Sequence, residues 1–126
     1  MTPETDSTMV KHTIERSGLP PIVFYGKEIA SASNCYGPNG HRSRWFKVEI
    51  YRTKGGRYVA SFNHYTQWQG ESDHLTADSF GSAGEVIDWL RLKDDDGLLG
   101  EVGQEAVEEA AENDLGFAAA WVEVVE

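Results

Sequence analysis

Two segments with alternating hydrophobic residues flank a glycine turn in the middle of this 126-residue chain. The segments are RWFKVEIYRT (44–53) and RYVASFNHYTQW (57–68), and Lys54-Gly55-Gly56 lies between them. Glycine adopts the positive φ of tight turns without strain, so this pattern predicts an antiparallel hairpin. The alternation predicts a single core face, made by Phe46, Val48, Ile50, Tyr58, Ala60 and Phe62. The residues expected on the other face are Trp45, Lys47, Glu49 and Tyr51.

Further strands are predicted on both sides of this hairpin. The run IVFYGKEIASA (22–32) is rich in branched and aromatic residues, and Gly26 within it is expected to mark a bulge or a close backbone approach. A turn-rich loop follows at 34–40, and HLTADSF (74–80) is short enough for an edge strand. Residues 1–20 show no sustained period and end in Leu-Pro-Pro, which predicts a flexible tail or an extended lead-in.

The second half of the chain changes to helical periodicity. Ser82-Ala83-Gly84-Glu85 has the spacing of a capping box and predicts a helix over 83–93. A second helix is predicted over 101–113, with valines and alanines on one side and glutamates on the other. In the segment 115–125 the alanines favour a helix and the valines favour a strand. Asp114, as an N-cap, favours the helix.

These elements predict an α+β fold. We expect a single domain over residues 21–126, with an antiparallel sheet of three or four strands and two or three C-terminal helices on one face. The one cysteine cannot close an intramolecular disulfide, which favours a reducing, cytoplasmic location. No apolar run reaches the roughly 18 to 20 residues of a membrane span, and the first residues lack the pattern of a signal peptide. We therefore expect no membrane partner.

The formal charge of -10 is distributed unevenly along the chain. Residues 1–66 contain nine Lys or Arg and five Asp or Glu, whereas residues 67–126 contain two and sixteen. The net charges of the two halves are therefore +4 and -14. This division predicts two surfaces of opposite sign.

The segment YRTKGGRYV (51–59), preceded by FYGKEIA (24–30), resembles a pattern in small bacterial and phage proteins that include the EXLDI proteins. This chain ends in WVEVVE rather than in the Glu-x-Leu-Asp-Ile sequence of that group. The resemblance implies no activity and no site residues. In size and charge the chain is also similar to small acidic inhibitors encoded by phages and plasmids, such as anti-restriction and anti-CRISPR proteins.

The chain contains no motif for catalysis, nucleotide binding or metal binding. An EF-hand alignment of Asp94-Asp95-Asp96-Gly97 would place Leu92 and Gly103 where carboxylates are required. The potential zinc or thiol residues, Cys35, His41, His64 and His74, have no ligand-pair spacing. We therefore expect no metal and no cofactor, and we interpret the protein as non-enzymatic. A small enzyme without a recognisable motif stays as an alternative.

Basic residues near the aromatic residues of the hairpin suggest a second alternative, which is nucleic-acid binding. Aromatic side chains on a sheet can stack on bases while cations contact phosphates. The residues that would contact phosphates are Arg44, Lys47 and Arg57. The fourteen net negative charges of the second half oppose this interpretation through long-range repulsion.

The helix predicted over 101–113 carries glutamates at a spacing that brings like charges together. Its glutamates are Glu101, Glu105, Glu108, Glu109 and Glu112, and several of them are four residues apart. Each such pair costs roughly 0.2 to 0.5 kcal/mol on an isolated helix, so the group favours a cationic neighbour. It is either a solvated face, a face paired internally with Lys47, Arg52 or Arg57, or a recognition face. We favour recognition, by an acidic interaction module that binds a basic surface of a nucleic-acid-handling protein and acts as an inhibitor.

Overall fold

The computed structural model describes residues 9–37, 40–41, 43–93, 97 and 99–122. Asp94, Asp95 and Asp96 of the acidic turn therefore lie outside the described residues, as do the first eight residues. The strands in chain order are β1 (Val10–Arg16), β2 (Leu19–Ser33), β3 (Tyr36–Gly37), β4 (Gly40–His41), β5 (Arg44–Thr53), β6 (Tyr58–Thr66) and β7 (His74–Phe80). They are followed by the helices α2 (Ala83–Arg91), α3 (Glu101–Asn113) and α4 (Leu115–Ala120). The predicted α+β class is confirmed.

The main sheet has five strands in the order β1-β2-β5-β6-β7, and each strand is antiparallel to its neighbours. The expectation of three or four strands is therefore wrong. The additional strand is β1, which lies within the segment 1–20 for which a tail or lead-in was the expectation. It pairs with β2 through a turn at Gly18, whose φ of 75° favours glycine. The central hairpin of β5 and β6 and the edge strand β7 are confirmed.

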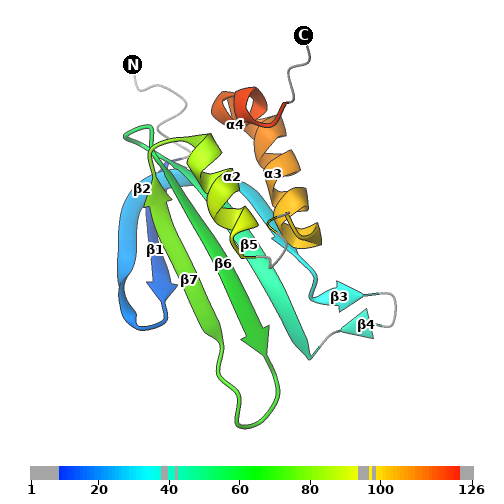
Figure 1. Cartoon of the computed structure of the whole chain (residues 1–126). Coiled ribbons are helices and arrows are strands. Elements are labelled where there is room, and N and C mark those ends of the chain that lie inside the picture. The colour runs from blue at the N-terminus through cyan, green and yellow to red at the C-terminus, as the bar shows by residue number, and fades with distance from the viewer. Residues whose placement is uncertain (1–8, 38–39, 42, 94–96, 98, 123–126) are drawn as a thin grey trace.

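The sheet curls until its two ends meet. The Ser17 backbone N–H donates to the Leu75 carbonyl at 2.8 Å, and the Leu75 N–H donates to the Ser17 hydroxyl at 2.8 Å. Strand β2 supports the curl because its register shifts between Glu28 and Ala30. The close approach predicted at Gly26 is present, since a Cβ there would lie 2.5 Å from the Arg52 carbonyl oxygen. In Figure 1 β1 consequently lies behind β7.

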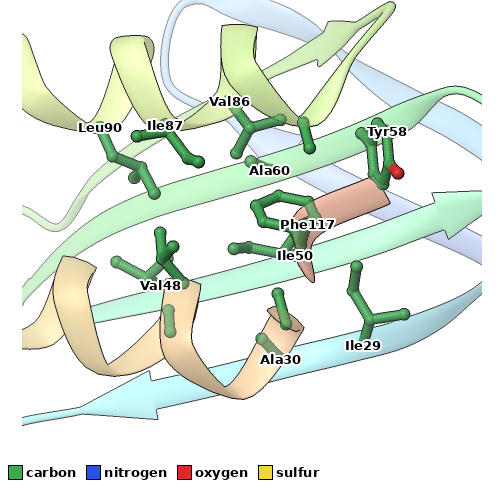
Figure 2. Close-up of a cluster of buried hydrophobic side chains, with 14 of the residues drawn as sticks. Ile29, Ala30, Val48, Ile50, Tyr58, Ala60, Val86, Ile87, Leu90 and Phe117 are labelled. Atoms are coloured by element: carbon green, nitrogen blue, oxygen red, sulfur yellow. The ribbon is translucent and has the colours of Figure 1, made fainter. Parts of the chain in front are cut away.

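Helices α2, α3 and α4 cover one face of the sheet (Figure 1). Their apolar sides meet the predicted core face of the hairpin, and Val48, Ile50 and Ala60 are completely buried. Figure 2 shows Phe117 of α4 between the sheet and the other helices, beside Ile50. The segment 115–125 is thus helical over Leu115–Ala120, with Asp114 as the predicted N-cap. Phe46 departs from the prediction, because it lies at the margin of this core and is 38% exposed.

The opposite face of the sheet is also buried, which corrects the expectation of a single core face. We call it the inner face, because it lies inside the curl. Tyr51 is 4% exposed and Val59 is 1% exposed, although both point away from the helices. The β1–β2 hairpin covers them, and the His12, Phe24 and Tyr51 rings contact one another with centroids about 5 Å apart. Curling therefore produces a second packed layer that strand alternation alone does not reveal.

The start of α2 is capped as its sequence predicts, with one difference. The Glu85 N–H donates to the Ser82 hydroxyl at 3.2 Å, whereas the Glu85 carboxylate accepts from Gly81 rather than from Ser82. Loss of a serine N-cap typically costs about 1 kcal/mol. We expect Ser82→Ala to lower the free energy of unfolding by about that amount, measured by urea denaturation. Ser79→Ala, on an exposed side chain of β7, is the control and should change the free energy by less than about 0.5 kcal/mol.

Candidate functional site

Helix α3 turns most of its glutamates away from the core. Its buried side consists of Val102, Gly103, Ala106, Val107 and Ala110. The opposite side presents four exposed glutamates at three- and four-residue spacing, Glu101, Glu105, Glu108 and Glu112. We call these four residues the acidic face. Glu101, Glu105 and Glu108, with Gln104, line a shallow surface depression there.

Glu109 differs from the other glutamates of α3. Its carboxylate accepts a 2.5 Å hydrogen bond from the Ser31 backbone N–H, on the part of β2 that β1 does not pair. About one helical turn further on, the Asn113 side-chain amide donates to the Ile29 carbonyl at 3.0 Å. Both contacts hold α3 along the edge of β2. Glu109 therefore has a structural partner, whereas the acidic face forms no ion pair among the described residues.

The cations that were candidates for internal pairing have other neighbours. Lys47 lies 3.9 Å from Glu49, and Arg52 lies 2.7 Å from Asp114. Arg57 is beside Gly81, at the hairpin end of the sheet. None of these three pairs with the acidic face within the part of the chain that the structure describes.

The three basic residues of the nucleic-acid hypothesis do not gather on one surface. Arg44 is at the start of β5 and forms two hydrogen bonds with the Glu71 carboxylate, at 3.0 and 2.6 Å. Arg57 follows the turn at the far end of β5, so the length of a ten-residue strand, roughly 30 Å, separates them. Lys47 is on the inner face beside Glu49. The structure thus separates these cations and places two of them beside carboxylates.

A pocket of about 300 Å³ opens where α2 and α3 meet the sheet. Phe46, Phe62 and Leu90 form its apolar wall, and Lys93 and Glu101 lie at its polar side. Burial lowers the pKa of Lys93, with partial compensation from Asp78. The exposure of Phe46 is explained by its position in this wall.

A polar cluster on the inner face was not anticipated from the sequence. It brings together Glu28 of β2 and Glu49 and Tyr51 of β5. The Tyr51 hydroxyl donates to Glu49 Oε2 at 3.1 Å, and Glu28 lies directly opposite Tyr51 in the pairing of β2 with β5. Burial, the hydrogen bond with Glu49 and repulsion from Glu49 raise the pKa of Glu28 to about 7. Burial and the two carboxylates also raise the pKa of Tyr51 well above its usual range.

The Glu28 side chain is exposed, and its carboxyl group is close enough to Glu49 for repulsion between two ionised carboxylates. This repulsion favours the protonated form of Glu28 near neutral pH.

Ser61 of β6 lies directly opposite Glu49 in the sheet, so both side chains are on the inner face. It is 1% exposed, and its Oγ has no hydrogen-bond partner among the described residues. Native proteins leave few buried polar atoms without a partner. The Ser61 hydroxyl is therefore a hydrogen-bond donor and acceptor for which the described residues supply no partner.

Two of the histidines considered for zinc chemistry, His64 of β6 and His74 of β7, lie directly opposite each other in the sheet. The His64 ring packs on Phe46. In the described residues, no group of three His, Cys, Asp or Glu side chains gathers around them or elsewhere.

No protein-family model, curated protein sequence or solved structure shows significant similarity to this chain. In the described residues, no helix has the length and apolar character needed to cross a membrane.

Proposed function

We propose that the protein is a non-enzymatic interaction module that presents the acidic face of α3 to a basic protein surface. The single observation that supports this proposal is that the four exposed glutamates form no ion pair with any cation in the described structure. Lys47 and Arg52, which could have neutralised them, lie beside Glu49 and Asp114 instead. Unpaired like charges retain a favourable free energy of association for a partner that brings cations.

The charge of α3 suits a partner that normally binds phosphates. A row of carboxylates at helical spacing offers negative charge at intervals along one direction, as a nucleic-acid backbone does. We infer that the partner is a nucleic-acid-handling protein and that occupation of its basic surface inhibits it. The negative charge of the acidic face mainly raises the association rate, because complementary potentials steer diffusion.

A triple variant, Glu105→Gln, Glu108→Gln and Glu112→Gln, tests the proposal without disturbing Glu109. Glutamine keeps the size and helix propensity of glutamate, and the change relieves the i,i+4 repulsions. We expect unchanged or slightly higher thermal stability, an association rate lower by about tenfold, and a weaker dependence of that rate on salt. The partner is first captured from source cells with the wild type, and the rates are then measured by surface plasmon resonance.

The matched control removes three other exposed charges by Glu15→Gln, Asp78→Asn and Asp88→Asn. Both triple variants have the same net charge, so a local contact and a general charge effect become distinguishable. Equal association rates for the two triple variants would contradict a specific role of the acidic face. An association rate that the α3 triple variant leaves unchanged would remove this face from the interaction surface.

A further inference from the structure

We propose that Glu28, Glu49, Tyr51 and Ser61 on the inner face form a binding site for a hard metal cation, for which calcium is the best fit. This site is separate from the acidic face of α3 and does not depend on the proposed interaction function. The starting observation is Ser61, a completely buried hydroxyl with no hydrogen-bond partner in the described structure, on the same face as Glu49.

The hydrogen bonds of the cluster leave several oxygen atoms without a donor. The Tyr51 hydroxyl has one proton and directs it to Glu49 Oε2 at 3.1 Å. The Ser61 hydroxyl carries one further proton of its own. These two protons serve four carboxylate oxygens, one phenol oxygen and the Ser61 oxygen. The site is thus rich in acceptors, which is the condition a metal ion satisfies.

The chemistry of these donors selects the class of cation. All four side chains offer oxygen, and carboxylate and hydroxyl oxygens suit calcium, magnesium and manganese rather than zinc or copper. The ligands come from three strands of a curled sheet. Calcium tolerates irregular sites with 2.3 to 2.6 Å contacts, whereas magnesium requires near-ideal octahedral geometry. Water molecules would complete the coordination.

Binding exchanges one cation for another. Lys47 lies 3.9 Å from Glu49 and is 38% exposed, so its ammonium group competes with the ion and can move to solvent when the ion binds. The positive charge of the ion then replaces that of Lys47 beside the carboxylates, so the site is left with no excess of either sign.

The neighbouring elements contribute one further cation near the cluster. On β1 the His12 ring packs against Tyr51, and Arg16 Nη1 lies 3.5 Å from the carbonyl of Ala77, which is opposite Ser61. On β7 the inner-face residues opposite β6 are uncharged, namely Leu75, Ala77 and Ser79. On α3 the Glu109 carboxylate contacts the neighbouring Ser31.

The experiment is a calcium titration of the full chain by isothermal calorimetry, repeated with terbium. Terbium replaces calcium at oxygen sites and emits when a nearby aromatic ring is excited, so Tyr51 provides an internal reporter. We expect a Kd for calcium of about 0.1 to 1 mM, the range of sites with few charged ligands. Because carboxylates bind the ion in their ionised form, affinity should decrease in acid. Magnesium should bind more weakly than calcium.

Four variants assign the site. Glu49→Gln should weaken calcium binding at least tenfold, because even outer-shell changes cost about that factor. Lys47→Met should strengthen binding, since it removes the competing ammonium group. His12→Phe keeps the ring stack and should leave calcium affinity unchanged, because His12 is not one of the proposed ligands. Asp88→Asn, an exposed carboxylate of α2, is the control and should bind calcium as the wild type does.

Ser61→Ala provides a readout that does not depend on whether the other variants fold. Removal of an unpartnered buried hydroxyl should raise the thermal midpoint of the metal-free protein while it lowers calcium affinity. A purely structural role of Ser61 predicts the first change without the second. A calcium concentration of about 10 mM is tenfold above the weakest expected Kd. If no binding is detected up to that concentration, the proposal is overturned. Binding that Glu49→Gln and Ser61→Ala leave unchanged would also overturn it, because the ion would then occupy another acidic segment.

Discussion

Ile50→Asp is expected to abolish cooperative unfolding of the protein. Ile50 is completely buried at the centre of the core between the sheet and the helices (Figure 2). Truncation of a buried isoleucine alone costs about 2 to 5 kcal/mol, and an unpaired buried carboxylate adds several more. Because domains of this kind are stable by about 5 to 15 kcal/mol, the sum removes most or all of the folded population. Circular dichroism during heating and urea denaturation measure the loss.

Phe46→Asp is the matched control, since Phe46 lies on the same strand and the same face, four residues away. Its side chain is 38% exposed at the wall of the pocket near α3, so an aspartate there stays hydrated. We expect this variant to fold cooperatively with a lower thermal midpoint. If Ile50→Asp unfolded with the wild-type midpoint, the assignment of the core face of β5 would be wrong.

Asp114→Ala is expected to lower the free energy of unfolding by about 2 to 4 kcal/mol, because it removes the N-cap of α4 and leaves buried donors unpaired. The Asp114 carboxylate is 6% exposed and lies 2.7 Å from Arg52. It also accepts hydrogen bonds from the Tyr58 hydroxyl at 2.6 Å and the Phe117 N–H at 3.1 Å. One side chain therefore connects the central hairpin to the C-terminal helix. Urea denaturation at neutral pH measures the change.

The pH dependence of this contribution follows from the pKa of Asp114. Burial, the largest effect, raises the pKa, but the contacts with Tyr58, Phe117 and Arg52 together lower it below its ordinary value. The stabilisation is therefore complete above the unfolded pKa of about 4 and is lost as the pH falls through the lower folded value. The difference between wild type and Asp114→Ala should thus shrink in acid, below about pH 4.

Asp114→Asn separates the two parts of this role. Asparagine is a good N-cap and keeps an acceptor oxygen for Tyr58, but it carries no charge for Arg52. We expect a smaller loss than for alanine, and a loss equal to that of alanine would contradict the capping contribution. Asp88→Asn, on an exposed carboxylate, should change the free energy by less than about 0.5 kcal/mol.

Local patterns in the sequence predict much of this fold. The hairpin turn, the Ser82 cap and the glutamate spacing of α3 each depend on residues close together in the chain, where strand alternation and helix capping act. The sequence also contains a weaker indication of strand β1, because Val10, His12 and Ile14 alternate before the turn at Gly18. The neighbouring Pro20-Pro21 obscures it, since prolines are tolerated there only because the start of β2 is exposed.

The inner-face cluster could not be predicted in the same way. Glu28 and Glu49 meet only because β2 and β5 pair with a register shift between Glu28 and Ala30. A different register would place the two carboxyl groups apart or on opposite faces. The glutamates of α3, in contrast, share a face whenever the segment is helical, so their spacing is readable from the sequence. The contact of Glu109 with β2 also depends on tertiary packing, so the sequence alone does not predict it.

The closure of the curl has a consequence for the order in which the chain folds. Ser17 and Leu75, whose hydrogen bonds close the sheet, are 58 residues apart, whereas β5 and β6 are joined by a short turn. Loop-closure entropy increases with the length of chain between two contacts, so the central hairpin forms at less cost than the closing contacts. We infer that the β1–β2 hairpin docks late, after β5, β6 and β7 are in place. Ser61 and its neighbours on the inner face are therefore enclosed only in the final step of folding.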